Sequence, residues 1–295
     1  MYFPTKFRKL FTITLFSELI LTSIFSCVVF NQDSLNNDEI VAFSDVDLDL
    51  SVHKHSCKES IIGNLVADAI LSVAQKRAQE TGRPIPYIAL INAGAISNKN
   101  RALDKIAAGP LFKQDIEQLL PFLDGLIIVT LSGFDIRILL ERSFNCIKPT
   151  GHNTHFLQLA GLLVQIDENA PAQLIANSQD KLIQKGQRVL KAELLIEGTL
   201  FPLKNESNYD VVTTTFLAQG LDGYISFLQM DEESNLVTDQ HGAFLTKANI
   251  KADVLKNSQG EPLSPAYALF SFLSDLSRKG RLVPIPSLGR IKSGF

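Results

Sequence analysis

The stretch YDVVTTTFLAQGLDGY, residues 209–224, decides most of what the sequence predicts. Its first part is rich in β-branched residues, which favours a buried strand over residues 209–217. Its second part, FLAQGLDGY, places an aromatic residue at each end of a turn that holds two glycines and Asp222. Such a turn either presents Phe216 and Asp222 to a flat, hydroxylated ligand or forms a well-packed hairpin corner. The stretch alone leaves both interpretations open.

Upstream of this stretch, helices and strands alternate. From Ile61 the apolar residues recur at helical spacing, and Gly82 followed by Pro84 supplies a stop. Further along, the pattern predicts strands at residues 87–92 and 126–132 and helices at 113–120 and 134–144.

The second half of the chain changes to strands separated by polar loops, at GLLVQID and AELLIEG. A final helix is predicted from Ser264, a good N-cap, through Pro265 to a stop at Gly280. The whole pattern predicts a single mixed α/β (α+β) domain over residues 42–295, with a mixed sheet and flanking helices.

The composition excludes one class of partner. The 295 residues include 28 Lys and Arg against 31 Asp and Glu, a formal net charge of -3. The basic residues are scattered along the chain and form no stripe or cluster of the kind that binds phosphate backbones. We therefore expect no nucleic-acid partner.

The first 26 residues have the order of a secretory signal: basic residues, an apolar run, then a small residue before Cys27. The tetrapeptide IFSC resembles a bacterial lipobox, which predicts lipidation of Cys27. A membrane-spanning anchor is the alternative, but Glu18 in the middle of the run disfavours it, and is also unusual in a signal peptide. The sequence thus predicts a signal peptide at 1–26, a tether at 27–41, and an exported protein, periplasmic or cell-surface, anchored to the bacterial envelope by lipid.

Two other cysteines, Cys57 and Cys146, remain in the expected mature chain. An oxidising compartment permits a disulfide between them. Two buried free thiols are the alternative, and the spacing does not choose between them.

Seven segments in register over about 250 residues carry a family resemblance: KESIIGNLVADAI from Lys58, INAGAIS, LLPF, LSGFDIRILLERSF, HFLQLAG, YDVVTTTFLAQGLDGY and GRI. In this order they resemble the C-terminal, substrate-binding domain of the 5'-nucleotidases, the family that includes UDP-sugar hydrolase and ecto-5'-nucleotidase. The resemblance covers essentially the whole expected mature chain.

The resemblance implies a site for a nucleoside or nucleotide. Two phenylalanines of the family stack on the base, and they match Phe122 and Phe216. The family's ribose-binding aspartate matches Asp222, and an asparagine near the base matches Asn92. Each residue also has a structural alternative: the phenylalanines as core residues, Asp222 as a cap for its own turn, and Asn92 as part of the turn after its strand.

The phosphate side departs from the family pattern. The two arginines that grip phosphate in the family match Ser97 and Ser56 here, and Leu221 replaces a glycine of the ribose turn. Charge-assisted contacts contribute about 1.5–3 kcal/mol each, so the loss of both arginines lowers the expected affinity for a phosphorylated ligand. Ser97 and Lys58 remain the candidate phosphate contacts.

The metal-binding motifs of the family's catalytic domain are not found in the sequence. The chain has five histidines; His53 and His55 suit a solvated segment, and Asp239 with His241 forms an isolated pair. We expect no catalytic residue, metal site or cofactor in this chain, with divalent metals only if a separate catalytic subunit exists. The expected function is nucleoside or nucleotide binding. The alternatives are the substrate-binding half of a split nucleotidase with a metallophosphoesterase partner, and an interaction protein without a ligand.

Overall fold

A computed structural model describes residues 39–50, 57–96, 104–147, 154–176, 182–229, 238, 240, 245–248 and 253–294. The chain divides into two units, residues 1–39 and 40–295, and the helices and strands given below belong to the second. The expected signal peptide and Cys27 lie outside the described residues. The first strand begins at Ile40, so the last two residues of the expected tether, Ile40 and Val41, belong to β1.

A mixed four-stranded sheet forms the centre of the larger unit, in the order β6-β13-β3-β7. Strand β13 runs parallel to β3, while β6 and β7 run antiparallel to their neighbours. This confirms the mixed α/β prediction. The bounds are β6 (Leu126–Ser132), β13 (Asn208–Thr214), β3 (Ile88–Asn92) and β7 (Leu157–Ala160).

Both faces of this central sheet are buried. Ala89 and Ile91 of β3 belong to the core cluster that includes α3 and α7, whereas Ile88 and Leu90 belong to the cluster that includes α5. Successive side chains of a strand point to opposite faces, so each face of β3 supplies one core. This double burial is why the strand is apolar from Ile88 to Ile91, without a polar alternation.

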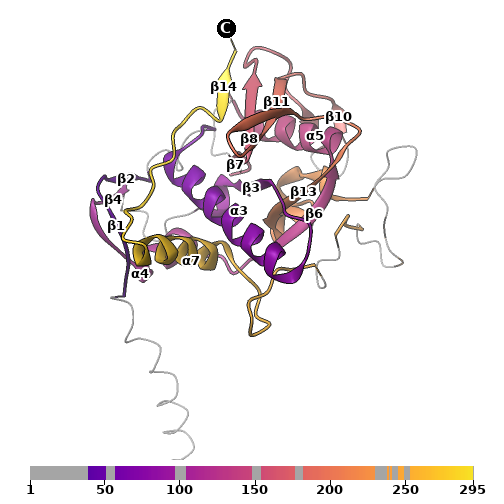
Figure 1. Ribbon diagram of the computed structural model, residues 1–295. Coiled ribbons are helices and arrows are strands. Elements are labelled where there is room, and N and C mark those ends of the chain that lie inside the picture. The colour runs from indigo at the N-terminus through magenta and orange to yellow at the C-terminus, as the bar shows by residue number, and fades with distance from the viewer. Residues whose placement is uncertain are drawn as a thin grey trace, which may run out of the picture. The chain divides into compact units, whose positions relative to one another are not determined.

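The helix signals in the sequence are confirmed. The Ser60 side chain caps α3 (Ile61–Thr81) by accepting from the Gly63 N–H at 3.0 Å, and Gly82 ends the helix at φ 65°. Ser264 caps α7 (Pro265–Arg278) in the same way, by accepting from the Tyr267 N–H at 3.1 Å. Helices α3 and α7 lie side by side (Figure 1). The shorter helices are α4 (Lys113–Leu119) and α5 (Gly133–Phe144).

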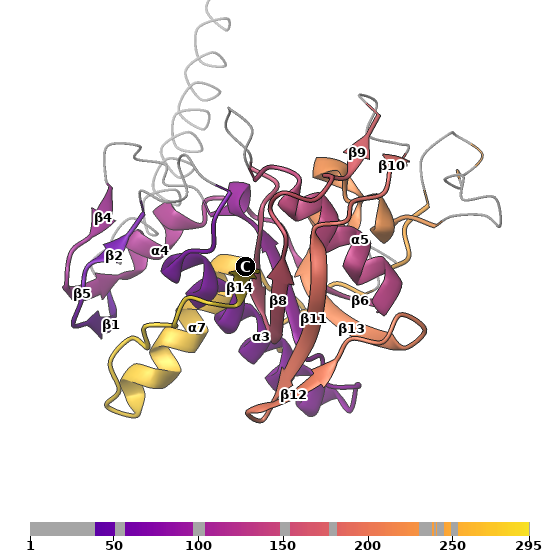
Figure 2. The same ribbon diagram turned by 90° about the horizontal axis from the view of Figure 1, so that it is seen from above.

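A second four-stranded sheet, in the order β12-β11-β8-β14, covers the core on the α5 side (Figure 2). The chain passes from β7 directly into β8 at Gly161, which has φ 74°. A Cβ at this position would lie 1.7 Å from the Tyr87 carbonyl oxygen, so only glycine fits. The bounds are β12 (Thr199–Pro202), β11 (Val189–Ile196), β8 (Leu162–Ile166) and β14 (Ile291–Ser293).

Glu59 holds this second sheet to the start of α3. Its carboxylate accepts hydrogen bonds from the backbone N–H groups of Gly289, Arg290 and Ile291, at 2.8, 3.0 and 3.3 Å. The sequence suggests only that Glu59 favours the positive end of α3. In the structure, Glu59 also holds β14 in place through these three hydrogen bonds.

Three two-stranded sheets complete the described fold. They pair β1 (Ile40–Ser44) with β5 (Gly109–Phe112), β2 (Leu48–Asp49) with β4 (Lys105–Ile106), and β9 (Leu174–Ile175) with β10 (Leu182–Gln184). In the part of the chain that the structure describes, no helix has the length and apolar character needed to cross a bilayer.

Candidate functional site

One edge of the central sheet collects all the described candidate residues. Strands β3 and β13 are parallel, so both end at this edge, and the antiparallel strands β6 and β7 begin there. The pairs Leu126 with Thr214 and Leu157 with Asn92 mark this edge in the register. The loops just before β6 and β7 and just after β3 and β13 therefore meet. Ligands of open α/β sheets bind at such carboxyl edges.

The strand predicted at residues 209–217 is too long, and the hairpin-corner interpretation of FLAQGLDGY is wrong. Strand β13 ends at Thr214, whose side chain accepts from the Leu217 N–H at 3.3 Å and so starts a helix. Phe216 lies in this short helix, α6 (Thr215–Ala218). The chain continues through two 3₁₀ turns, η2 (Leu221–Gly223) and η3 (Ile225–Phe227).

Asp222 and Asn92 meet at this edge although 130 residues separate them. The Asn92 amide Nδ2 donates to Asp222 Oδ2 at 2.9 Å. Asn92 is 4% exposed, and among the described residues its Oδ1 has no hydrogen-bond partner. Burial raises the pKa of the Asp222 carboxyl, while the Asn92 hydrogen bond and the nearby Arg142 charge act in the opposite direction. Asp222 thus offers a carboxylate that can accept from a ligand, while the Asn92 amide oxygen is buried beside it.

The two phenylalanines lie on segments joined at this edge. The Thr215 N–H donates to the Gly125 carbonyl at 2.8 Å, so the loop that carries Phe122 meets the helix that carries Phe216. Phe122 is 50% exposed, which excludes the core interpretation for that residue. Phe216 is partly buried and packs against the core cluster around α5. The Phe122 ring is therefore accessible to a ligand, and the Phe216 ring is held in place by the core.

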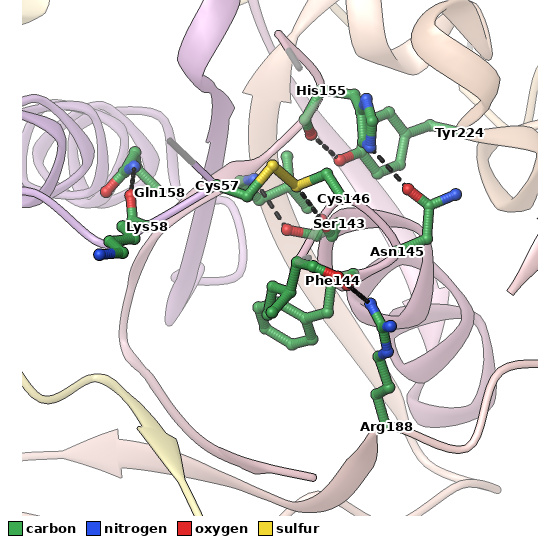
Figure 3. Close-up of a disulfide and its surroundings, with 12 residues drawn as sticks. Cys57, Lys58, Ser143, Phe144, Asn145, Cys146, His155, Gln158, Arg188 and Tyr224 are labelled. Atoms are coloured by element: carbon green, nitrogen blue, oxygen red, sulfur yellow. Dashed lines mark hydrogen bonds between the residues drawn. A yellow bond between two sulfur atoms is a disulfide. The ribbon is translucent and has the colours of Figure 1, made fainter. Parts of the chain in front are cut away.

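Arg142, Asn145 and His155, which the sequence did not single out, support the Asp222 turn together with Tyr224. The Arg142 Nε donates to the Asp222 carbonyl at 2.8 Å. In Figure 3 the Tyr224 hydroxyl and the Asn145 amide both point to His155: the hydroxyl donates to the His155 carbonyl, and Asn145 Oδ1 lies 2.8 Å from Nε2. Burial, with the Arg142 charge, lowers the pKa of His155 to about 4, so the ring is neutral at pH 7. The segment LSGFDIRILLERSF contains Arg142 and HFLQLAG contains His155, but nothing in their spacing showed that these residues lie near the Asp222 turn.

The two cysteines form a disulfide, which decides the alternative left open by the sequence. Cys57 and Cys146 are bonded with a Cα–Cα separation of 5.8 Å (Figure 3). The bond joins the segment before α3 to the end of α5, which also carries Arg142 and Asn145. The disulfide therefore ties the segment before α3 to the part of the chain that supports the Asp222 turn.

Lys58 lies near the same edge through its main chain. The buried Gln158 side chain donates to the Lys58 carbonyl at 3.0 Å and accepts from the Ser60 N–H at 3.1 Å. Gln158 pairs with Ile91, the neighbour of Asn92, and the Lys58 side chain is exposed. The other phosphate candidate, Ser97, lies outside the described residues, as do Ser56, His53, His55, Asp239 and His241.

No metal-binding cluster is found among the described residues: none of them forms a group of three or more His, Cys, Asp or Glu that could hold an ion. What the described edge offers is an exposed aromatic ring, a supported aromatic ring, a carboxylate and a buried amide. Groups of these chemical types can stack on flat rings and accept hydrogen bonds from hydroxyl groups.

Comparison with known proteins gives a consistent picture. A family model described as the 5'-nucleotidase, C-terminal domain matches residues 40–229. An apyrase of Aedes aegypti is 29% identical over 182 residues, covering 59% of this chain and 28% of that protein. A solved structure, the 5'-nucleotidase precursor of Thermus thermophilus, matches with a TM-score of 0.58 and 24% identity over 95% of this chain and 43% of that one. The chain thus spans well under half the length of these proteins.

Proposed function

The chain belongs to the family of 5'-nucleotidase C-terminal domains, and on this premise we propose that it binds a nucleoside or nucleotide at the carboxyl edge of its central sheet. The observation that carries the proposal is the Asn92–Asp222 hydrogen bond of 2.9 Å. It joins the end of β3 to the turn that follows β13 at that edge, where the segments of Phe122 and Phe216 also meet.

The base is held by stacking between the two phenylalanines. Base-on-aromatic stacking contributes about 1–3 kcal/mol per base and tolerates different bases, because every base has a π-face. Phe122 is 50% exposed, whereas Phe216 packs on the core. The supported ring therefore sets the plane of the base, and the exposed ring closes over it.

The ribose is held by Asp222. An ionised carboxylate accepts hydrogen bonds from two neighbouring hydroxyl groups, and such charge-assisted bonds are stronger than neutral ones. Asn92 already donates to one carboxylate oxygen, which fixes the side chain before the ligand arrives.

Phosphate adds little affinity in this proposal. The family's phosphate arginines are matched by Ser97 and Ser56, and a serine supplies no charge. Lys58, exposed near the edge, remains a candidate contact, but an ammonium does not reproduce the bidentate fork of arginine. Adenosine and AMP should therefore bind with similar affinity.

Hydrolysis by this chain alone is outside the proposal, because the sequence contains no segment resembling the metal-binding motifs of a phosphoesterase. A second candidate follows from the coverage of the relatives. The chain spans 28% of the Aedes apyrase and 43% of the Thermus enzyme, so a separate metallophosphoesterase subunit that supplies the remainder would make this chain the substrate-binding half of a split nucleotidase.

Export is part of the proposal, with lipidation of Cys27 as the anchor to the bacterial envelope. The Cys57–Cys146 disulfide supports it, because such bonds persist in oxidising compartments outside the cytosol. Mass spectrometry of the protein from its native membrane tests the anchor. A diacylated N-terminal cysteine at position 27 is the expected result, and an intact N-terminus would contradict it.

The binding proposal is tested by calorimetric titration of the full chain, in mild detergent, with adenosine, AMP and UDP-glucose. Phe122→Ala and Phe216→Ala should each weaken adenosine binding about 5- to 100-fold. Phe134→Ala is the matched control, because Phe134 is similarly exposed, at 47%, but follows β6 at the opposite edge of the sheet. Equal affinity in all three variants would overturn the clamp.

A further inference from the structure

Arg142 lies flat against the turn that carries Asp222. Its Nε donates to the Asp222 carbonyl at 2.8 Å. A Cβ built on Gly223 would lie 2.8 Å from Nε and 3.1 Å from Cζ, so a larger residue here would displace the guanidinium from its present position. Gly223 also has φ 79°. The turn and the arginine are thus shaped to each other.

Asp222 itself has an unusual backbone. Its φ of 58° and ψ of 16° lie in the left-handed region, which few residues other than glycine adopt. Two elements hold it there: Arg142 of α5 binds its carbonyl, and Asn92 of β3 binds its carboxylate. Loss of Arg142 would remove the main-chain hydrogen bond and leave the side-chain bond to Asn92.

The charges around Asp222 also depend on Arg142. The groups that face the carboxylate are Asn92 of β3, Tyr224 beyond the turn, and Arg142 of α5, with His155 behind them. Burial raises the pKa of Tyr224 well above its usual value and keeps His155 neutral above about pH 4. Arg142 is therefore the cation of this group at neutral pH.

We propose that Arg142 is a positioning residue of this site: it fixes the Asp222 turn through the main chain and keeps the Asp222 carboxylate ionised for the ribose hydroxyls. The inference rests on the proposed function for its ligand. Its physical content, that Arg142 holds the Asp222 turn and favours the charged carboxylate against the effect of burial, is measurable without any ligand.

The binding test compares Arg142→Gln and Arg142→Lys in the full chain, by calorimetry with adenosine between about pH 4 and pH 8. Affinity is lost as pH falls and Asp222 takes up a proton. In Arg142→Gln this loss should occur at higher pH, because the neighbouring positive charge is gone. Arg142→Lys keeps the charge but not the planar donor, so it should weaken binding roughly tenfold with the pH midpoint unchanged.

Arg137→Gln is the matched control. Arg137 is also on α5, and its Nε donates to Asn205 Oδ1 at 2.9 Å, away from Asp222. This variant should leave both the affinity and the pH midpoint unchanged. A structural role common to the arginines of α5 would move all three variants alike and would overturn the proposal.

The ligand-free test is a carbon-13 NMR titration of the aspartate carboxyls, with Asp222→Asn to assign the signal. Removal of Arg142 should raise the pKa of Asp222, and it should also raise the pKa of His155, because the same charge disfavours the imidazolium. Identical titrations in the wild type and Arg142→Gln would overturn the inference. If adenosine binds nowhere but the titrations move, the proposed ligand is wrong and the role of Arg142 stands.

Discussion

Glu141, a residue of α5, and Asp222, whose main chain is bound by Arg142 of the same helix, are two carboxylates in different surroundings. Glu141 is 5% exposed, and its two oxygens accept from the backbone N–H groups of Val189 and Arg188 at 2.8 and 3.0 Å. Asp222 is less buried, and among the described residues Asn92 is the donor recorded to its carboxylate. Burial raises the pKa of both groups.

Comparison of Glu141 with Asp222 shows how a carboxylate that stabilises the fold differs from one that can bind a ligand. Both acids have an arginine nearby, Arg188 and Arg142, so the charge partner does not distinguish them. The two carboxylates differ in how many further hydrogen bonds their oxygens can still accept. Both oxygens of Glu141 accept from backbone N–H groups at the start of β11, which stabilises the fold. The Asp222 carboxylate can accept further hydrogen bonds from a hydroxylated ligand.

The largest effect should come from Glu141→Ala. This change leaves two buried backbone N–H groups without acceptors and removes the charge beside Arg188, so we expect a loss of about 3–5 kcal/mol in the free energy of unfolding. Urea unfolding followed by circular dichroism measures it. A loss below about 1 kcal/mol would show that Glu141 is not the structural partner in the comparison.

Loss of the disulfide should rank second. Cys57→Ser, Cys146→Ser and the double variant each remove the same bond, which closes an 89-residue separation, and each should lose about 2–4 kcal/mol in unfolding free energy. Adenosine affinity should change less than about twofold, because Arg142 and Asn92 still hold Asp222. A large loss of affinity in the folded variants would place the disulfide within the binding machinery.

The third effect depends on pH. His155 has a pKa of about 4 in the folded chain against 6.5 as its ordinary value, so the unfolded chain binds more protons between these pH values. Stability from the neutral ring is complete above about pH 6.5 and is lost as pH falls toward 4, by up to about 3 kcal/mol. His155→Gln should flatten this part of the curve of unfolding free energy against pH. An unchanged curve would contradict the burial of His155.

The smallest effect on stability should come from Asp222→Asn. The folded pKa of Asp222 is raised, so folding disfavours its charge at neutral pH. The neutral amide should therefore keep or slightly raise the melting temperature, while adenosine binding falls about tenfold or more with loss of the charged acceptor. If stability falls as far as in Glu141→Ala, the two carboxylates are alike and the comparison fails.

Local signals predicted the framework of this fold well. Gly82 ends α3 and Ser264 starts α7 as predicted, because caps and stops depend on a few neighbouring residues. The length of β13 was overestimated because Thr214, a good strand residue, also caps α6. The resemblance named Asp222 and Asn92 but not their contact.

The long-range parts could not be predicted from local patterns. The Arg142–Asp222 bond spans 80 residues, and Glu59 reaches residues more than 220 positions away. The disulfide stayed an open alternative until the fold placed Cys57 against the end of α5. Such contacts depend on the arrangement of whole elements, which a single sequence does not show.

The most direct test of the central claim is a crystal structure of the chain with adenosine. The account predicts the base between Phe122 and Phe216, with both ribose hydroxyls on the Asp222 carboxylate and Asn92 still bonded to it. Adenosine bound elsewhere, or an edge that stays closed to it at saturating concentration, would contradict the claim that this carboxyl edge is the nucleoside site.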